Sequence, residues 1–399
     1  MVKILPLQII KEMKTELSGI DIHILTRELN KELATSRIDK TYQIAEKELK
    51  VRLHVRGEGS SDLIIAPNFI CITRYKRASP EKPSSFAMQL RKHLRGAYIR
   101  EIRQRKFERI VEFCIEKNDL GYRLICELFS RGNVILCDSE GKILGLLEWQ
   151  RWKHRKLGVG QEYSYPPERI NPLKISLSEF RRILEVSGKS MVVTLATDLS
   201  LGGTYAEEVC LRADIYKDKT FGDLSGDEVK RLCNVFQDLM ATVRNHEIKP
   251  RIILDNGKAI DVIPFPLRIY GDNELKEFES FNSAIDEYFS EKESISVRRE
   301  ADIRFNQKLE KMRFIVDEQE KTIRELEEKA IEYKSIGDTI YQNIHETGEI
   351  LKTVRKLRDR GYKWDEINKE LSGKRFNKLM IESVDKDLSI NLKTVGDGR

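Results

Sequence analysis

The spacing of hydrophobic residues predicts helices and strands along the first part of the chain. Apolar residues recur at helical spacing over residues 21–33 and again over residues 86–94, so both segments are expected to be amphipathic helices. Short alternating or continuous apolar runs predict strands around these helices, and strands this closely spaced favour a largely antiparallel sheet. The predicted strands are residues 51–55, 63–66, 69–73, 98–103, 107–116, 122–128, 133–137 and 143–148.

The pattern changes after these strands. A proline cluster over residues 165–172 indicates a domain boundary, and helices are expected near residues 191–199 and 205–213. Gly202 and Gly203 join the two helices, which suggests a helix–hairpin–helix: the glycines allow a tight turn, and N–H groups at the start of the second helix can face a phosphate. An ordinary glycine-capped turn between two helices would have the same pattern. Further on, Asp255-Asn256-Gly257 lies between two apolar runs, residues 252–254 and 259–263, and predicts a β-hairpin.

From about residue 302 the hydrophobic positions follow a heptad repeat. Ten of twelve seam positions are apolar or aromatic, which predicts a coiled coil. A single seam needs a partner: a returning helix, a second copy of the chain in a homodimer, or a binding target. Only a basic segment (352–363), a helix (364–371) and a hairpin (379–392) follow, so we expect a chain truncated before the returning arm. The seam positions are Phe305, Leu309, Met312, Val316, Gln319, Ile323, Leu326, Ala330, Tyr333, Gly337, Ile340 and Ile344.

The charges are distributed unevenly. Of 399 residues, 71 are Lys or Arg and 65 are Asp or Glu, so the formal net charge is only +6. Residues 74–109 nevertheless hold twelve basic and three acidic residues, and residues 151–156 add a further net +4. These two stretches carry +13 and the rest of the chain −7. Such runs are typical of a solvated basic face or of a nucleic-acid-binding surface, and the nearby Trp149 and Trp152 favour nucleic acid.

One predicted strand places a charge on its apolar face. Strict alternation along residues 107–116 puts Arg109 on the face of Val111 and Phe113, with Glu108 on the other face. A charge beside a core is costly unless it is paired or lies at an edge. Arg109 therefore either extends to solvent from the start of the strand or presents a fixed guanidinium to an RNA backbone or base.

Several classes of protein are excluded. No apolar run approaches 18 residues and no signal-peptide pattern begins the chain, so neither a membrane span nor classical secretion is predicted, and a cytoplasmic location is expected. The six cysteines show no C-x-x-C spacing, which argues against a zinc ribbon and favours reduced thiols. No metal or cofactor site is predicted. The cysteines are Cys71, Cys114, Cys126, Cys137, Cys210 and Cys233.

Seven segments form an ordered set of motifs along the chain: residues 21–22 (DI), 85–96 (SFAMQLRKHLRG), 107–111 (FERIV), 127–136 (ELFSRGNVIL), 160–173, 201–208 (LGGTYAEE) and 281–289 (FNSAIDEYF). This set resembles the NFACT family, the ribosome quality-control factors known as RqcH in prokaryotes and NEMF in animals, and archaeal members are the most similar. The resemblance covers essentially the whole chain.

The resemblance implies an α+β architecture with a modular layout. Residues 1–172 would form a mixed α/β NFACT N-terminal domain with a largely antiparallel sheet, and residues 173–270 a helix–hairpin–helix domain. Residues 271–360 would form a long coiled-coil arm, and residues 361–399 the start of the middle region. Nothing in the sequence matches the family's C-terminal RNA-binding domain.

The implied activity is not catalysis. Such factors bind the large ribosomal subunit with an obstructed peptidyl-tRNA, and they recruit tRNA (alanyl-tRNA in prokaryotic relatives) for template-independent tailing of the stalled chain. The expected partners are therefore the large subunit, its rRNA and tRNA. Glu108 replaces an aspartate that is commoner in the family. The residues assigned to tRNA are Asp21, Glu108, Arg109, Arg131 and Asn133, and those assigned to RNA phosphates are Arg91, Lys92, Arg95, Gly202 and Gly203.

Three other functions share some of these sequence features. A DNA glycosylase of the formamidopyrimidine type is similar in its N-terminal architecture and its helix–hairpin–helix, but it needs an N-terminal proline amine beside a glutamate. Here the chain begins Met1-Val2-Lys3, Pro6 is followed by Leu7, and there is no four-cysteine motif. Bacterial relatives carry fibronectin-binding names, but an adhesin would need an export signal. A generic coiled-coil scaffold is the third alternative.

Overall fold

The protein is represented by a computed structural model that describes residues 13–129, 132–152, 155–386 and 389–395, with the side chains of residues 292–306 left undescribed. The chain forms two compact units, Met1–Val297 and Arg298–Arg399, and each is described by itself.

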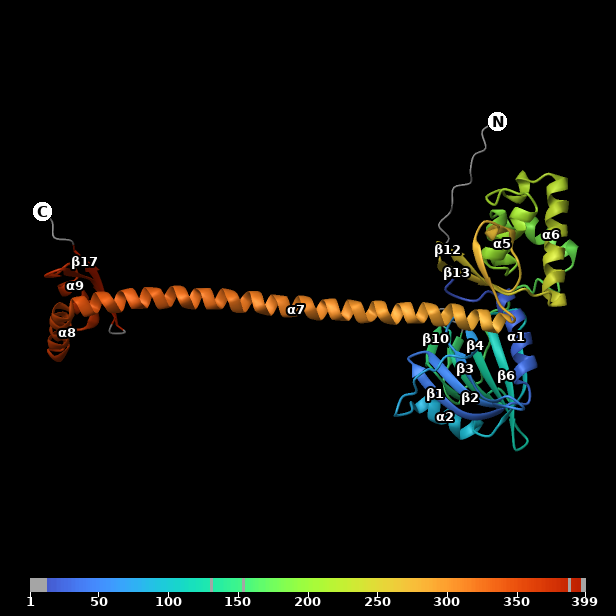
Figure 1. Ribbon diagram of the computed structural model, residues 1–399, viewed down its shortest axis with the longest axis horizontal. Helices are drawn as coiled ribbons and strands as arrows, with labels where there is room; N and C mark the ends of the chain where they lie inside the picture. The colour runs from blue at the N-terminus through green and yellow to red at the C-terminus, as the bar shows by residue number, and fades with distance from the viewer. Residues whose placement is uncertain (1–12, 130–131, 153–154, 387–388, 396–399) are drawn as a thin grey trace. The chain divides into compact units, whose positions relative to one another are not determined.

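A nine-stranded antiparallel sheet is the largest element of the first unit (Figure 1). Its strand order is β4-β3-β2-β1-β5-β6-β7-β8-β9. Strands that follow each other in the sequence are paired, except for β4 and β5, because β5 pairs with β1 instead. The predicted antiparallel sheet is therefore confirmed, although β1 was not predicted. The strands are β1 Arg37–Ala45, β2 Glu48–Val55, β3 Gly59–Ile65, β4 Ile70–Thr73, β5 Tyr98–Gln104, β6 Ile110–Lys117, β7 Leu120–Glu127, β8 Val134–Asp138 and β9 Ile143–Leu146.

Two helices cover this sheet where the sequence predicted them. Helix α1 (Gly19–Leu33) begins with a capping box between Ser18 and Asp21 and packs on β5. Helix α2 (Ser85–Leu94) contacts both β1 and β9, which four strands separate in the sheet order. The sheet must therefore curl for one helix to reach both strands.

The start of strand β6 differs from the prediction. The strand begins at Ile110, because Lys106 and Phe107 adopt positive φ angles of 42° and 70° and form a turn. Alternation thus does not extend to residues 107–109, and the expectation that Arg109 lies on the apolar face of a strand is wrong. Both faces of β6 carry buried residues: Val111 faces the main core, and Ile110 joins a second cluster with strands β7 to β9.

The rest of the first unit is helical with one small sheet. The helix predicted near residues 191–199 is a short α4 (Met191–Val193) that continues as a π-helix over Thr194–Asp198, and α5 (Gly203–Arg212) follows Gly202, whose φ is 80°. The hairpin predicted around Asp255-Asn256-Gly257 is confirmed. The other elements are α3 Leu177–Ser187, α6 Gly226–Asn245, β10 Gln150–Trp152, β11 Arg155–Leu157, β12 Arg251–Asp255, β13 Lys258–Ile263 and β14 Glu274–Glu277.

The first residues of helix α7 (Phe281–Gln342) belong to the core of the first unit. Five apolar side chains between residues 281 and 289 are buried among those of the sheet and of α5. Asn282 covers the edge of the sheet: its side-chain amide accepts the Ile72 N–H at 2.8 Å and donates to the Ile72 carbonyl at 3.1 Å. The Glu28 carboxylate accepts the N–H groups of Phe281 and Asn282. Residues 1–172 and 173–270 thus share one core with the start of 271–360.

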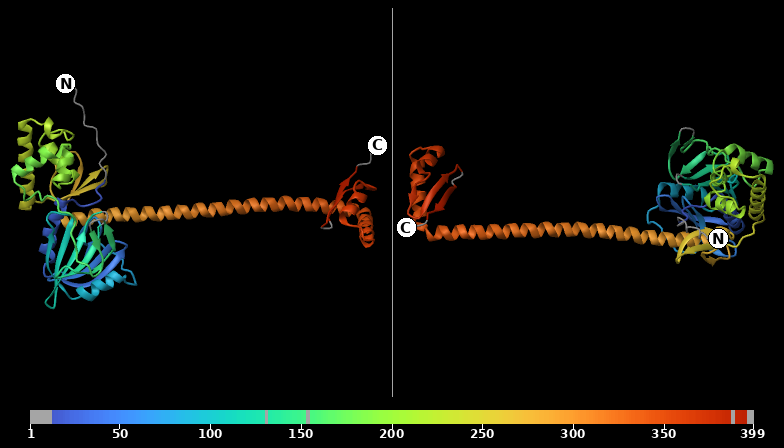
Figure 2. Two further views of the ribbon diagram at one scale, coloured as in Figure 1. Left: turned by 180° about the vertical axis from the view of Figure 1, so that it is seen from behind. Right: turned by 90° about the horizontal axis from the view of Figure 1, so that it is seen from above.

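The second unit has its own small core. Helix α8 (Ile344–Asp359), helix α9 (Trp364–Leu371) and the sheet of β15 (Arg375–Phe376), β16 (Leu379–Val384) and β17 (Ile390–Thr394) form it, and the predicted hairpin over 379–392 is confirmed (Figure 2). Residues 344–359 therefore bury their apolar face in this core.

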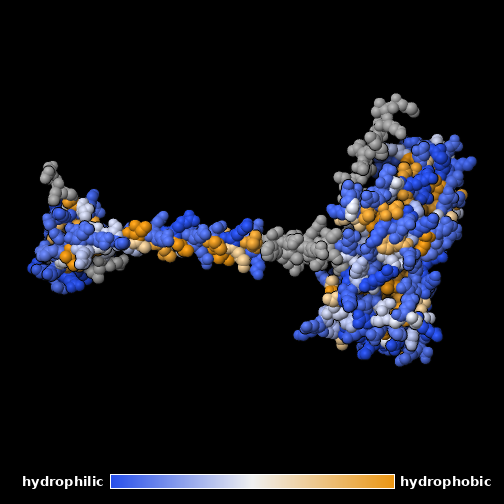
Figure 3. Space-filling model, viewed as in Figure 1, coloured by the Kyte–Doolittle hydropathy of each residue, from blue (hydrophilic) through white to orange (hydrophobic). Residues whose placement is uncertain are grey.

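The heptad seam is exposed along α7. Apolar side chains from Leu309 to Ile340 are 37–68% exposed at the predicted seam positions that are described, and hydrophobic residues recur along this part of the helix (Figure 3). The coiled coil and the homodimer stay predictions.

Replacing Asn282 by alanine is expected to lower the free energy of unfolding of the first unit by about 2–4 kcal/mol. The substitution leaves the Ile72 N–H and carbonyl without partners, and an unsatisfied buried polar group costs about 1–3 kcal/mol. Urea unfolding followed by circular dichroism measures the change. The exposed Glu279→Ala in the preceding turn is the control and should stay within about 0.5 kcal/mol of wild type. Equal stability of both variants would contradict the role of Asn282.

Replacing Ile381 by alanine is expected to destabilise the second unit alone. The side chain is fully buried in the core of α8, α9 and the β15–β17 sheet, and such truncations cost about 2–5 kcal/mol. Hydrogen–deuterium exchange should accelerate over residues 344–394 and stay unchanged in β5 to β8. Faster exchange in the large sheet would show that the two units do not unfold independently.

Candidate nucleic-acid interface

The centre of the candidate site is the turn that joins β5 to β6. Phe107, in its left-handed conformation, buries its ring under α1, and a Cβ at Gly19 would lie 3.0 Å from the Phe107 carbonyl oxygen. The Gln104 side-chain amide donates to the carbonyls of Gly19 at 2.9 Å and Glu108 at 3.0 Å. The turn is therefore fixed against the start of α1, and it presents Glu108 and Arg109 to two different segments.

Glu108 faces the linker that follows the large sheet. Its carboxylate accepts the backbone N–H of Arg169 at 2.7 Å, and the adjacent Lys106 forms an ion pair with Glu168. The Arg105 guanidinium lies 4.2 Å from the ring centre of Tyr165. Three side chains of one turn thus hold residues 165–169, and Glu108 in this structure makes a protein contact.

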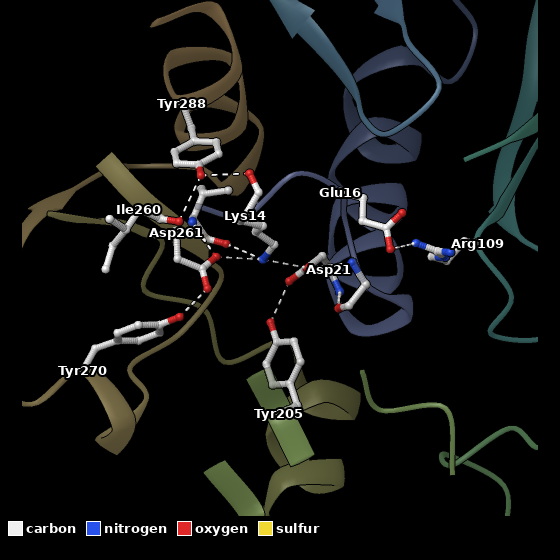
Figure 4. Close-up of polar contacts among 11 residues, drawn as sticks. Lys14, Glu16, Asp21, Arg109, Tyr205, Ile260, Asp261, Tyr270 and Tyr288 are labelled. Carbon is white, nitrogen blue, oxygen red and sulfur yellow. Dashed lines mark hydrogen bonds and ion pairs between the residues drawn. The ribbon is translucent and has the colours of Figure 1, made fainter. Parts of the chain in front are cut away.

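Arg109 faces the N-terminal segment instead (Figure 4). Its guanidinium forms an ion pair with Glu16, and 28% of the Arg109 side chain and 45% of the Glu16 side chain remain exposed. The Arg109 carbonyl accepts the Leu128 N–H at 2.8 Å, which fixes its backbone to the end of β7. Because a guanidinium binds phosphate as readily as carboxylate, an incoming phosphate can replace Glu16 as its partner.

A buried charge cluster lies beside this pair (Figure 4). The Lys14 ammonium lies 2.9 Å from Asp21 Oδ2 and 3.0 Å from Asp261 Oδ1, and it donates to the Val262 carbonyl at 2.7 Å. The Tyr205 hydroxyl donates to Asp21 Oδ1 at 2.6 Å, the Tyr270 hydroxyl donates to Asp261, and the Tyr288 hydroxyl donates to the carbonyl of Lys14 at 2.9 Å. Residues from four distant parts of the chain therefore meet around one ammonium group.

The surroundings hold the Lys14 ammonium and the Tyr205 hydroxyl in their protonated forms. Burial by itself lowers the pKa of Lys14, but the carboxylates of Asp21 and Asp261 outweigh it and hold that pKa above its ordinary value. Burial and the adjacent Asp21 raise the pKa of Tyr205 well above its usual range. A group with a raised folded-state pKa stabilises the fold below its unfolded pKa and loses this contribution as the pH rises further. The contributions of Lys14 and Tyr205 are thus complete at neutral pH and are lost as the pH rises into the alkaline range.

The loop after β7 holds two other predicted residues. Arg131 lies outside the described residues. Asn133 is buried, and its side chain accepts the N–H groups of Val134 at 2.9 Å and Glu148 at 3.0 Å while donating to the Glu148 carbonyl. The Asn133 amide therefore shapes this loop.

Glu127, at the end of β7, was not among the predicted site residues. Its carboxylate is buried. Oε1 pairs with the Arg155 guanidinium and accepts the Tyr163 hydroxyl at 2.7 Å, and Oε2 has no hydrogen-bond partner among the residues that the structure describes. Burial and Glu127 together raise the pKa of Tyr163. A buried carboxylate with one oxygen unpaired within the described part of the chain is a further candidate for the site. The motif at residues 127–136 contains it, but alternation alone does not single it out.

The residues predicted to bind phosphates differ in their surroundings. Lys92 and Arg95 are exposed and form no ion pair within the described part of the chain. Arg91 is half-buried: its Nε donates to the Thr41 carbonyl at 2.8 Å, and its guanidinium lies 5.0 Å from the Tyr42 ring centre. Gly203, the first residue of α5, is exposed, and a Cβ there would meet only open space, whereas Gly202 lies against Ser18.

Two absences concern only the described residues. They contain no cluster of three or more His, Cys, Asp or Glu side chains that could hold a metal ion. Among them there is also no helix of the length and apolar character that a membrane crossing requires.

Comparisons with known proteins agree with this architecture. The sequence model described as "NFACT N-terminal and middle domains" matches residues 18–393. The archaeal Rqc2 homolog aRqcH of Methanocaldococcus jannaschii is 31% identical over 97% of this chain and 60% of its own length. The human ribosome quality control complex subunit NEMF is 26% identical, with coverages of 89% and 35%, and the Rqc2 homolog RqcH of Bacillus subtilis is 28% identical, with coverages of 79% and 55%. The chain thus spans between about a third and three fifths of these relatives.

A solved structure shows the same mixed α/β fold. The N-terminal part of the fibronectin/fibrinogen-binding protein of Streptococcus suis is 26% identical, with a TM-score of 0.57, and the similarity covers 69% of this chain and all of that one. The family match, which extends over nearly the whole chain, places the protein in the NFACT family.

Proposed function

We propose that this protein is a ribosome quality-control factor that binds RNA without catalysing a reaction of its own. Its partners are the large ribosomal subunit with an obstructed peptidyl-tRNA and a recruited tRNA, with alanyl-tRNA the first choice, for template-independent C-terminal tailing. The observation that carries the proposal is the family match over residues 18–393, which relates the chain to proteins named as ribosome quality-control factors. Such a factor acts in the cytoplasm.

The turn at the centre of the site supports this function through the Arg109 guanidinium. Arg109 is held by a rigid turn, is partly exposed, and has a carboxylate partner that a phosphate can replace. Glu108 keeps the linker over residues 165–169 in place. The exposed Lys92 and Arg95 supply phosphate contacts that position RNA without reading its sequence, and Gly203 opens the start of α5 to a backbone phosphate.

The first test is recovery of large subunits. The protein, extended to its full length where the natural chain is longer, is used to capture ribosomal particles that carry peptidyl-tRNA, and the RNA that is recovered is sequenced. Large-subunit rRNA together with a restricted set of tRNAs supports the proposal, and no ribosomal RNA above background refutes it. Incision of a duplex that contains an oxidised purine would favour the glycosylase alternative instead.

Replacing Arg109 by alanine is expected to reduce the tRNA recovered with large subunits by about tenfold. A charge-assisted contact to RNA is worth about 1.5–3 kcal/mol, and about 1.4 kcal/mol corresponds to tenfold. Arg100→Ala is the matched control, because Arg100 is an exposed arginine of β5 that pairs with Glu116 on β6. Equal tRNA recovery for the Arg109 variant and wild type, with both folded, would remove Arg109 from the site.

Replacing Lys92 and Arg95 together by glutamine is expected to weaken binding to all RNAs alike. Each lost phosphate contact should reduce the slope of log affinity against log salt by about 0.7–0.9, so the double variant should lose about 1.5. Binding titrations over a range of salt concentrations measure this slope. Neutralising Lys230 and Lys258, two exposed lysines of the same unit, is the control. A wild-type slope in the first variant would show that the end of α2 faces solvent only.

A further inference from the structure

The Asp21 carboxylate is closed to RNA by burial. The residue is fully buried, Oδ1 accepts the Tyr205 hydroxyl at 2.6 Å, and Oδ2 accepts the Ser18 N–H at 2.8 Å and contacts the Lys14 ammonium at 2.9 Å. A direct contact with RNA would require the residues that cover this carboxylate, its Lys14 partner among them, to move away. Breaking a buried ion pair on one side costs about 3–5 kcal/mol, which a single new contact does not offset.

Asp21 instead fixes the short segment of residues 13–18, which precedes α1. Lys14 belongs to this segment and is fixed through both its side chain and its backbone. Its ammonium pairs with Asp21, its N–H donates to the Ile260 carbonyl at 2.8 Å, and its carbonyl accepts the Tyr288 hydroxyl. Four residues on, the Ser18 N–H donates to Asp21 itself. The segment is therefore held at two points by the same carboxylate.

This segment carries the partner of Arg109. Glu16 lies between the two fixed points, and its carboxylate contacts the Arg109 guanidinium. The first turn of α1 provides a second connection, because the Gly19 carbonyl accepts the Gln104 amide of the β5–β6 turn at 2.9 Å. Asp21 is thus linked to Arg109 through the segment that carries Glu16 (Figure 4), and also through the base of the β5–β6 turn.

We propose that Asp21 is a positioning residue of the RNA site: paired with Lys14, it fixes residues 13–18 and thereby sets Glu16 and Arg109, and it does not touch RNA. This inference rests on the proposed function, because it needs Arg109 to bind RNA. It assigns to Lys14 a part in RNA binding although the Lys14 side chain is only 10% exposed.

The test is a set of mutant cycles with RNA affinity as the readout. The probe is deacylated bulk tRNA, titrated against the full chain by fluorescence anisotropy. Asp21→Asn and Lys14→Met are expected to weaken binding similarly, by about three- to thirtyfold, as is typical of residues that modulate a site without contacting the ligand. The double variant should bind like either single variant. In an Arg109→Ala background, Asp21→Asn should change affinity less than about twofold, because contacting residues in one network are not additive.

Asn282→Ala separates positioning from a general loss of stability. It is expected to destabilise the same unit through a contact at the far edge of the sheet, next to β4, and it should leave tRNA affinity at the wild-type value. Circular dichroism confirms that each variant is folded at the temperature of the titration. Weaker tRNA binding by Asn282→Ala in proportion to its lost stability would overturn the proposal.

The remaining outcomes are equally decisive. Additive effects of Asp21→Asn and Lys14→Met, or an undiminished effect of Asp21→Asn in the Arg109→Ala background, would mean that Asp21 acts on RNA by another route, and the positioning role would be wrong. Wild-type affinity in a folded Asp21→Asn variant would also overturn it. These results leave the proposed function standing. No tRNA binding by the wild-type chain, or none lost on Arg109→Ala, would instead remove the tRNA site and this inference together.

Discussion

The burial of one ammonium group organises the first unit of this protein. Lys14 leaves water to lie between Asp21 and Asp261, and the cost of removing three charges from solvent is offset only because the geometry satisfies each of them. The two aspartates lie 240 residues apart in the chain, so Lys14 can contact both of them only after α1 and β13 have come together. The hydroxyls of Tyr205 and Tyr270 donate hydrogen bonds to these two carboxylates, and they connect α5 and the residues after β13 to the same cluster. The sheet and the helical part thus share a polar anchor within a largely apolar core.

The β5–β6 turn lies beside this anchor and is itself held in a strained conformation. A turn with two consecutive non-glycine residues at positive φ is strained, and such strain persists only where the surroundings hold it. Here the buried ring of Phe107, the Gln104 amide and the linker contacts of Glu108 supply that support. The consequence is an arginine whose backbone is fixed while its side chain is still partly exposed. Pre-organised cations of this kind bind phosphate with less loss of conformational entropy than a flexible lysine would.

Local patterns predicted much of the fold and little of the site. Helices α1 and α2, most strands of the sheet and both hairpins follow from periodicity and turn residues, because neighbouring residues determine them. The predicted position of Arg109 on the strand was wrong because alternation assumes a regular strand. Nothing in the residue types shows that Lys106 and Phe107 adopt left-handed conformations. The partner of Asp21 could not be predicted either. Lys14 precedes every predicted element, and its second partner, Asp261, belongs to a hairpin almost 250 residues away.

Glu108 and Arg109 are neighbours in the turn, but their side chains contact different segments of the chain. The glutamate side chain is one methylene longer than that of aspartate, and in this chain its carboxylate extends to the Arg169 N–H. That contact is with the protein backbone, so the Glu108 side chain holds the linker, and the adjacent Arg109 guanidinium is the group left for RNA in the proposed site. Since Glu108 and Arg109 face different segments, a change at one need not displace the other. The turn therefore keeps Glu108 from pairing with the adjacent guanidinium, whose carboxylate partner is Glu16 on the segment before α1, and this partner can be exchanged for a phosphate without moving Glu108.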